Sequence, residues 1–412
     1  MSRIVGASVE GLGLVDVRLD NAVITSISPR YQDIGHQEIG HQDIAEPLGE
    51  GDFDARGLML VTSLAEPHAH LDKAFLAERV HNATGDLMGA INAMHEASAS
   101  LTFDDTVERA SRAVRLMVKN GVTRIRTHAD TFDGSTMQVQ ALRAVSHSFK
   151  DICDIQVCAL VQWPLTGPEG APSRRLAEQA RHDGADLIGG CPHLDSDPSG
   201  ANQIFLDLAR DLNCALDLHV DETLNPAMFS LVDLAQRVGE NPLPFGVTAS
   251  HCVSLGMQDE TTQREVSRLL ASSGVSVVTL PQTNLYLQGR AHVTAMPRGF
   301  TALRALGEAG VRVAGGADNL QDPFNPVGRG DPLETAALLV AGAHYLPHDA
   351  FNAVSQLAHK IIVDSNNAIQ PGAPADLLLV RARNVRELIA FASHERAVIY
   401  RGQMVSNTLI NA

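Results

Sequence analysis

The run Leu58–His70 begins with apolar residues and ends in Glu66-Pro67-His68-Ala69-His70. Further short apolar runs follow it, and several of them also end in His, Asp or Glu: Val122–Asp130, Ile155–Gln162, Ala185–Gly190, Ala215–Glu222, Gly246–His251, Gly274–Asn284 and Val311–Asp318. Runs of this length and composition are typical of the buried strands of a parallel sheet. Eight such strands predict an α/β fold, a (β/α)₈ TIM barrel, in which the carboxyl ends of the strands share the rim that carries the chemistry.

The segments between these runs have the apolar spacing of amphipathic helices. The clearest examples are Thr106–Lys119, Arg174–His182, Ala201–Leu212, Ala227–Val238 and Thr301–Ala309. Gly121 and Gly310 each follow a helical segment and precede a strand, which is where a helix C-terminus favours glycine. The alternation indicates parallel βαβ units. An open doubly wound sheet has similar local signals, but eight units favour closure.

The two ends of the chain share a different pattern, in which short β-rich pieces are broken by polar turns. These pieces are Leu14–Leu19, Ala22–Ile27 and Leu58–Val61 near the start, and Leu377–Val380 and Ala397–Arg401 near the end. We expect the two ends to pair as one small β-sandwich domain. The predicted organisation is therefore a sandwich made of residues 1–60 and 365–412, with the barrel over residues 61–364.

Composition excludes several classes of partner. The chain has 412 residues and a formal net charge of −16, which disfavours binding to nucleic acids or to anionic membranes. It lacks a signal-peptide pattern and an apolar stretch of the roughly 18–20 residues that a membrane span needs, so we expect a cytoplasmic protein.

The five cysteines are odd in number and lack CxxC spacing, which indicates reduced thiols. A repeat at residues 33–44 contains His36 and His41, and we interpret it as a solvated loop rather than a metal tract.

Residues able to bind a metal stand at several of the predicted strand ends. His68 and His70 alternate along one strand and therefore point the same way. An HxH pair is also common on protein surfaces, but His219, His251 and Asp318 end three other strands of the same predicted barrel. Imidazole and carboxylate ligands suit zinc, iron(II) or manganese, and an open position would let the metal activate water. Glu222, three residues after His219, is placed to move protons.

At these residues the sequence resembles the amidohydrolase superfamily, and within it the cytosine deaminase-like branch. The resemblance lies in five segments: EPHAHLD at 66–72, RTHAD at 126–130, HVDE at 219–222, TASHC at 248–252 and GADNLQDPF at 316–324. It implies that one divalent ion, Zn²⁺ or Fe²⁺, is held by a set of four ligands, namely His68, His70, His219 and Asp318. It also implies catalytic roles for Glu222 as a proton shuttle and for His251 as the residue that orients water. Asp318 would take a proton from that water, and Gln162 would bind the amide edge of a substrate.

Departures from the family pattern bear on the metal count and on the substrate. Dinuclear relatives carry a carboxylated lysine after the fourth strand, whereas Ile188–His193 contains none, so a mononuclear site is expected. His193 is interpreted as a hydrogen-bonding neighbour of the site, with ligation as the alternative, and His128 and Asp130 as supporting residues. Lys73, Asn319 and Phe324 differ from cytosine deaminase at positions expected to contact substrate.

The resemblance therefore implies a hydrolytic deaminase that acts on a small amino-substituted N-heterocycle resembling cytosine and releases ammonia. An N-alkylammelide-type aminotriazine or a pterin is the alternative substrate, and a cyclic-amide hydrolase is the alternative activity. A non-enzymatic barrel protein is the remaining class. Barrels of this family also lead us to expect a homo-oligomer.

Overall fold

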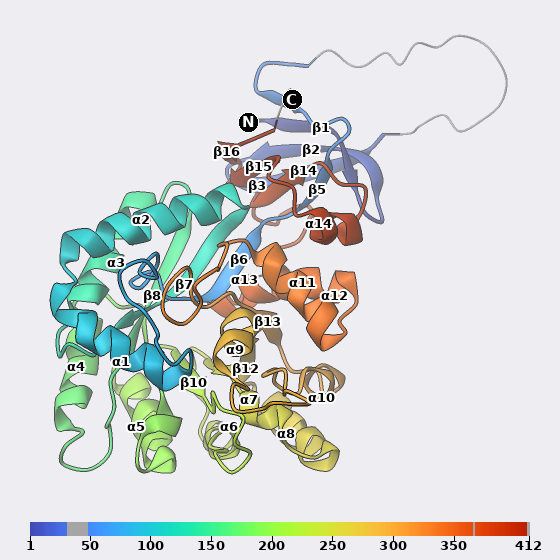
Figure 1. The fold of residues 1–412 in the computed structure, drawn as a ribbon. Coiled ribbons are helices and arrows are strands. Elements are labelled where there is room, and N and C mark those ends of the chain that lie inside the picture. Colours follow the sequence, from blue (N-terminus) through green and yellow to red (C-terminus); the bar gives the residue numbers. More distant parts are fainter. Residues whose placement is uncertain (31–47, 366, 410–412) are drawn as a thin grey trace, which may run out of the picture.

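The computed structural model describes residues 1–30, 48–365 and 367–409 (Figure 1). The repeat with His36 and His41 lies outside the described residues. The chain forms two sheets, each of eight strands. One belongs to a barrel surrounded by helices, and the other is a smaller sheet beside it that contains strands from both ends of the chain (Figure 1).

The barrel strands are all parallel and follow one another in chain order. They are β6 (Leu64–Ala69), β7 (Val122–Asp130), β8 (Asp154–Val161), β9 (Leu187–Gly190), β10 (Leu216–Val220), β11 (Val247–His251), β12 (Ser276–Thr279) and β13 (Val313–Gly315). A parallel bridge between Ala69 and Asp318 joins the end of the eighth strand to the first. The predicted (β/α)₈ barrel is confirmed.

Helices fill the connections between barrel strands and cover the outside of the barrel (Figure 1). Those between barrel strands are α1 (Leu87–Ala97), α2 (Phe103–Lys119), α3 (Met137–Phe149), α4 (Ala171–His182), α5 (Pro198–Asp211), α6 (Leu231–Glu240), α7 (Val253–Gly256), α8 (Glu260–Ser273), α9 (Pro281–Leu287) and α10 (Leu303–Glu308), with 3₁₀ turns at Ser98–Ser100 and Pro192–Leu194. The last barrel strand is followed by α11 (Pro332–Ala343), α12 (Pro347–Ala353) and α13 (Gln356–Val363), and α14 (Val385–Phe391) lies between two strands of the terminal sheet. Side chains of Thr102, Asp197, Asp259 and Asp331 cap helix N-termini, so the starts of these helices are locally specified.

Two predicted runs end differently from expectation. The run Leu58–His70 is two strands, because the chain leaves the terminal sheet after β5 (Met59–Thr62) and enters the barrel at β6. The run Gly274–Asn284 is strand only as far as Thr279, and its second half is the start of α9. Pro281 explains this boundary, since proline suits the first turn of a helix and not the middle of a parallel sheet.

The terminal sheet joins the two ends of the chain through hydrogen bonds. Its strands are β1 (Arg3–Val9), β2 (Gly13–Asp20), β3 (Val23–Pro29), β4 (Asp52–Asp54), β5, β14 (Leu377–Val380), β15 (Arg396–Tyr400) and β16 (Gln403–Asn407). The order is β16-β15-β14-β5-β1-β2-β3, with β4 also paired to β1. Ile4, Leu60 and Ile399 belong to one apolar cluster of this module. The predicted pairing of the two ends is therefore confirmed.

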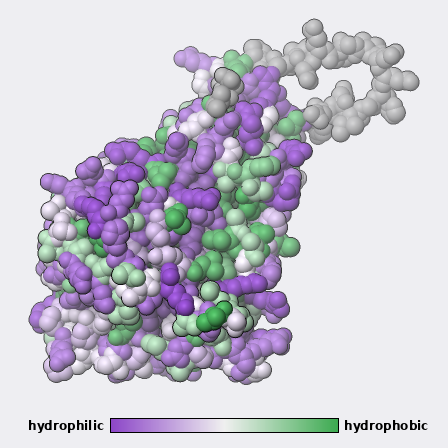
Figure 2. All heavy atoms as spheres, in the orientation of Figure 1, coloured by the Kyte–Doolittle hydropathy of each residue, from purple (hydrophilic) through white to green (hydrophobic). Residues whose placement is uncertain are grey.

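The surface is mixed, with large apolar side chains scattered among hydrophilic ones on the face shown (Figure 2). The five cysteines are free thiols, four of them buried and Cys191 partly so. Among the described residues, no helix combines the length and apolar character required to cross a bilayer.

Candidate metal and active site

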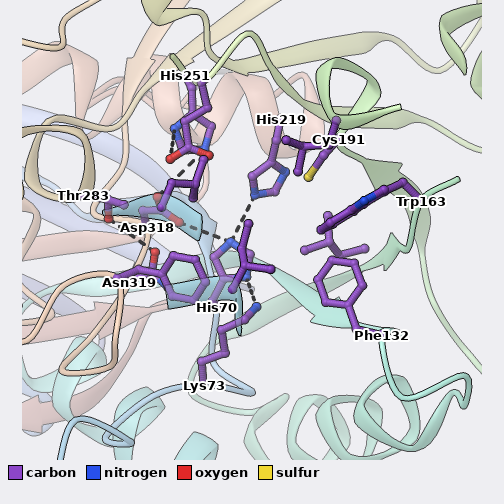
Figure 3. A pocket seen from close by; sticks show the side chains of 16 residues that line it. His70, Lys73, Phe132, Trp163, Cys191, His219, His251, Thr283, Asp318 and Asn319 are labelled. Carbon is purple, nitrogen blue, oxygen red and sulfur yellow. Dashed lines mark hydrogen bonds and ion pairs between the residues drawn. The ribbon is translucent and has the colours of Figure 1, made fainter. Parts of the chain in front are cut away.

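The predicted metal ligands come from three separated parts of the barrel and meet at its carboxyl rim. Figure 3 shows three of them, His70, His219 and Asp318. His68 lies in β6 and His70 just after it, His219 lies in β10, and Asp318 follows β13. All four side chains are buried, with His68 fully inaccessible beneath the other three. The sequence motifs are therefore neighbours in space.

The ligand atoms of these residues form a closed ring. His68 Nε2 lies 3.1 Å from His219 Nε2, which lies 3.2 Å from His70 Nε2. Asp318 Oδ1 completes the ring at 3.2 Å from His70 Nε2 and 3.7 Å from His68 Nε2. A ring with these edges holds its atoms roughly 2.3 Å from a common centre, close to the 2.0–2.2 Å that zinc makes with nitrogen and oxygen.

The protonation and pairing of these atoms also suit a cation. Burial lowers the pKa values of His68, His70 and His219 well below the usual range, which favours neutral imidazoles, each with one nitrogen lone pair. Asp318 Oδ1 is buried and has no hydrogen-bond partner in the part of the chain that the structure describes. His251 with His68 and Asp318, and His128 with His68 and His219, are two groups of possible ligand atoms within 4.8 Å of one another. The donor set fits one divalent ion.

A chain of side chains beneath the ring fixes the orientation of His68. Its Nδ1 lies 2.9 Å from Ser250 Oγ, and the Ser250 hydroxyl donates to Asp217 Oδ1 at 2.9 Å. Arg126 donates to the other carboxylate oxygen of Asp217 at 2.8 Å. A histidine that donates from Nδ1 presents its Nε2 lone pair to the ring, the arrangement found behind metal-binding histidines. Neither Ser250 nor Asp217 is predictable from local sequence pattern, since each contacts His68 only through the fold.

Backbone geometry brings Asp318 against the first strand. Asp318 N donates to His68 O at 3.0 Å, and His70 N donates to Asp318 O at 3.2 Å. Asp318 itself has φ of +67°, a left-handed conformation that costs an ordinary residue about 1–2 kcal/mol. A Cβ on Gly316 would lie only 2.8 Å from Glu66 Oε1, so glycine permits this close approach. Glu66 accepts from Ala317 N at 3.0 Å, and burial raises its pKa to about 8.

Glu222 and His251 lie together on another side of the ring. Glu222 Oε1 is 3.5 Å from His251 Nδ1, which also lies 3.0 Å from Asn284 Oδ1. His251 Nε2 faces Asp318 Oδ2 at 3.9 Å and has no hydrogen-bond partner within residues 1–30, 48–365 and 367–409. Burial, followed by the charge of Asp318, raises the pKa of Glu222 well above its usual value. Burial lowers the pKa of His251 to about 4. Burial therefore favours the uncharged form of both members of the pair.

Lys73 forms the opposite wall. Its Nζ lies 2.9 Å from His70 Nδ1 and 2.8 Å from Asp130 Oδ1, and it sits 5.9 Å from the centre of the Phe324 ring. Burial opposes the charge of Lys73, but Asp130 and Asp72 outweigh it and raise the lysine pKa above its usual value. A fixed positive charge therefore borders the space above the ring.

The space above the ring is a cavity of about 450 Å³, including its opening to solvent. Its walls include the T-shaped pair Phe132 and Trp163, whose ring centres are 5.0 Å apart, and also Leu87 and Ile91 (Figure 3). Flat aromatic walls above a polar floor suit a planar ring compound. The sequence analysis missed these apolar lining residues, because nothing in their local pattern separates them from core residues.

Gln162 and Asn319, which are predicted to bind substrate, are less directly placed for that role than Lys73. Gln162, just after β8, is not among the described residues that line the cavity, so its role stays a prediction. Asn319 lines the cavity, but its Nδ2 donates to Asp322 at 2.7 Å and its Oδ1 accepts from Thr283 at 3.3 Å. The protein itself therefore holds both ends of this amide.

His193, His128 and the end of β9 lie around the ring rather than on the cavity wall. His193 Nδ1 lies 3.1 Å from the carbonyl oxygen of His219, consistent with the predicted supporting position. The His128 ring lies 4.1 Å from that of His68, and neither of its nitrogens has a hydrogen-bond partner among the residues described. A Cβ on Gly190 would meet Phe205 Cζ at 2.2 Å, so glycine lets α5 pack closely against this strand end, which contains no lysine.

The whole chain is similar to several known proteins. The sequence model of the amidohydrolase family matches residues 73–406. A pterin deaminase from Rhizobium rhizogenes is 31% identical over 98% of this chain and 90% of its own length. The crystal structure of a 5-methylcytosine deaminase from Klebsiella pneumoniae is 28% identical, with a TM-score of 0.88 over 100% of this chain and 98% of that one. An N-isopropylammelide isopropylaminohydrolase from Burkholderia multivorans is 25% identical, with a TM-score of 0.81 over 99% of both chains.

Proposed function

The chain belongs to the amidohydrolase family, as its motifs predict, and on that premise we propose that it is a metal-dependent hydrolytic deaminase of an amino-substituted N-heterocycle. The observation that carries the proposal is the placement of Glu222, His251 and Asp318 around one ring of ligand atoms at the floor of an aromatic cavity. His68, His70, His219 and Asp318 would hold a single Zn²⁺ or Fe²⁺. When bound there, such an ion lowers the pKa of water toward neutrality.

The remaining chemistry is assigned to side chains of the chain itself. Burial and the charge of Asp318 raise the pKa of Glu222 and so favour its protonated form, from which it would donate a proton to a ring nitrogen of the substrate. His251 is neutral and presents an unpaired Nε2 toward Asp318, so it can accept a hydrogen bond from water and orient it. Asp318 would accept a proton from that water and pass it to the departing amino group. The products are the oxo-substituted ring and ammonia.

The shape of the cavity supports a flat, uncharged or anionic substrate. Phe132, Trp163 and Phe324 present aromatic surface, and Lys73 offers a cationic donor to a carbonyl oxygen. A cytosine-like ring is our first candidate, supported by the structural match to 5-methylcytosine deaminase. A pterin is the second, supported by the 31% identical relative that matches along the chain.

The test is ammonia release from a panel of aminopyrimidines, aminotriazines and pterins, with ring opening followed for cyclic amides. Metal-loaded enzyme is expected to deaminate at least one member, and chelated enzyme is expected to deaminate none. His219→Ala is expected to lose metal and activity together. The matched control is His182→Ala, because the His182 side chain is 85% exposed and lies away from the ring. Metal-loaded enzyme that releases no ammonia across the panel would contradict the proposal, and ring opening alone would favour the cyclic-amide hydrolase.

A further inference from the structure

The proposed reaction needs one particular form of the His251 imidazole. A neutral imidazole carries one hydrogen, on Nδ1 or on Nε2, and only the nitrogen without it can accept a hydrogen bond. If Nε2 is to accept a hydrogen bond from water, the hydrogen must be on Nδ1. The hydrogen bonds that surround a histidine ring decide between the two tautomers.

The contacts of His251 favour a hydrogen on Nδ1. This nitrogen lies 3.0 Å from Asn284 Oδ1, an amide oxygen that can only accept. Glu222 Oε1 is farther away, at 3.5 Å from the same nitrogen. On the other side of the ring, Nε2 is 3.9 Å from Asp318 Oδ2, which is beyond hydrogen-bond distance, so this carboxylate does not hold a hydrogen on Nε2. The contact with Asn284 therefore decides the tautomer.

Asn284 makes this contact from a position where an asparagine is otherwise unfavourable. The residue is 1% exposed, and its Nδ2 has no hydrogen-bond partner among the described residues. Leaving a buried donor unsatisfied costs about 1–3 kcal/mol. Leucine has nearly the same shape and would avoid this cost. The oxygen that faces His251 explains why an amide is present here.

The helix that carries Asn284 is tied to the active site on both sides of this residue. Thr283 Oγ1 donates to Asn319 Oδ1 at 3.3 Å. Gln288, which follows the last residue of α9, donates from Nε2 to the carbonyl oxygen of Glu222 at 3.0 Å. These two contacts limit the movement of α9 and so keep Asn284 Oδ1 against the imidazole.

The backbone of His251 is also held in an uncommon conformation. His251 has φ of +69° and the next residue, Cys252, has φ of +50°, so two left-handed residues follow one another. Each costs an ordinary residue about 1–2 kcal/mol. Conformations of this kind persist where the surrounding structure holds them, and they cluster at active sites. The fold therefore places the His251 ring, and the remaining variable is which of its nitrogens carries the hydrogen.

We propose that Asn284 is a positioning residue that keeps the hydrogen of His251 on Nδ1, so that Nε2 presents its lone pair toward Asp318 and the cavity. The inference rests on the proposed function, in which His251 uses that lone pair to orient water. A hydrogen already on Nδ1 also prevents this nitrogen from accepting the Glu222 proton that the substrate needs. Asn284 itself is not among the described residues that line the cavity, so it acts only through His251.

The first test determines the tautomer of His251 by ¹⁵N NMR of the zinc-loaded enzyme with labelled histidines, in the absence of substrate. The signals of His251 are identified by their loss in His251→Gln. The wild type is expected to carry the hydrogen on Nδ1. Asn284→Leu removes the acceptor and is expected to move the hydrogen to Nε2, whereas Asn284→Asp retains an acceptor oxygen and is expected to keep it on Nδ1.

The second test is steady-state kinetics on the best panel substrate. In Asn284→Leu, kcat should fall about 10–100-fold, as is usual when a contact that orients an active-site histidine is lost. KM and metal content should stay at the wild-type values. The matched control is Gln282→Met, because Gln282 is another buried amide of α9 and donates from Nε2 to Thr335 Oγ1 at 2.7 Å, outside the cavity. This control is expected to keep both the tautomer and kcat.

Three results would overturn the proposal. They are a hydrogen on Nε2 in the wild type, a hydrogen that stays on Nδ1 in Asn284→Leu, and a changed tautomer with an unchanged kcat. If Asn284→Leu does not fold, Asn284→Ala removes the same acceptor. Because the tautomer is measured without substrate, a wild type that deaminates no member of the panel would contradict the proposed function and still leave the origin of the tautomer tested.

Discussion

The floor of the barrel and its carboxyl rim both contain buried polar side chains, but the two regions differ in how these are paired. At the floor, Arg126 donates to Gln156, Asp217 and Thr248 and to the carbonyl oxygens of Ile361 and Ile362. These contacts use every group that a guanidinium can donate from. At the rim, His219 Nδ1, His251 Nε2 and Asp318 Oδ1 are buried without a hydrogen-bond partner among the described residues.

Paired and unpaired buried polar groups therefore have different roles, the first structural and the second functional. A fully paired buried ion stabilises one arrangement of the strands around it, and removing either partner is costly. An unpaired buried lone pair is unfavourable by itself and is retained where a ligand supplies the missing contact. The unpaired atoms at the rim therefore lower the stability of the fold but are available to bind a ligand. The paired side chains at the floor hold the ends of the strands in register.

The largest expected effect is at the rim, in Glu222→Gln. The amide keeps the shape of the side chain but cannot transfer the acidic proton, so turnover should fall by about 10²–10⁴-fold. Metal content should stay at the wild-type level, because Glu222 is not one of the four proposed ligands. Metal analysis and steady-state kinetics on the best panel substrate measure both quantities, with exposed Glu240→Gln as the control. A variant with near-normal turnover would remove Glu222 from the mechanism.

The next effect is at the floor, in Arg126→Met. The change leaves the Asp217 carboxylate buried without its cationic partner, and the unfolding free energy should fall by about 3–5 kcal/mol. Urea unfolding of the metal-free protein measures it. The double variant Arg126→Met, Asp217→Leu removes both charges and should recover much of the loss. If the single variant were as stable as the wild type, the paired floor would not have the structural role assigned to it.

Ser250→Ala tests the connection between the two regions. The change cuts the link from His68 Nδ1 to Asp217 while leaving all four proposed ligands in place. Loss of such a supporting contact should weaken metal binding about 10–100-fold. Competition with a chelator measures the affinity. Ser267→Ala is a matched control, since Ser267 Oγ is buried and has no partner in the described chain. Equal affinities in the two variants would show that the floor does not orient His68.

The same division explains what the sequence could predict. The period of the strands and the residues at their ends sufficed to place His68, His219, His251 and Asp318 on one rim, because parallel strands in a barrel end at the same side. Pairings between side chains leave no local periodic signal, which is why the contact between Ser250 and His68 was not foreseen. The predicted and observed elements also differ where an apolar run that is predicted as a single strand contains two elements.

Asn284 shows what happens when an apolar run that is predicted as one strand contains a second element. It was expected within the strand run Gly274–Asn284, yet it lies in α9 and contacts His251. Helix and strand cannot be separated by periodicity in so short a run, and Pro281 was the available signal. Trp163 lines the cavity while its neighbour Gln162 does not, and this depends on the loop after β8 rather than on strand alternation.

The smallest expected effect concerns His359, a paired histidine beneath the barrel. Its Nε2 lies 3.2 Å from Ser63 Oγ, and its Nδ1 lies 3.3 Å from Arg124 Nη1. Burial, followed by the charge of Arg124, lowers its pKa to about 3, whereas in the unfolded chain it is about 6.5. Between these two values the unfolded chain binds the extra proton, so this residue makes stability fall as the pH drops below about 6.5 and has no effect above it.

His359→Gln should remove that contribution and flatten the stability curve by about 1.4 kcal/mol per pH unit within this window. The measurement is the unfolding free energy of both proteins at about pH 5 and about pH 7, and the quantity of interest is the difference between their slopes. Buried histidines at the rim add their own slope to both proteins, and that shared part cancels in the comparison. Parallel curves would mean that His359 is protonated in the folded protein. The floor would then contain a charged imidazole beside the Arg124 guanidinium, and repulsion between these two cations opposes that state.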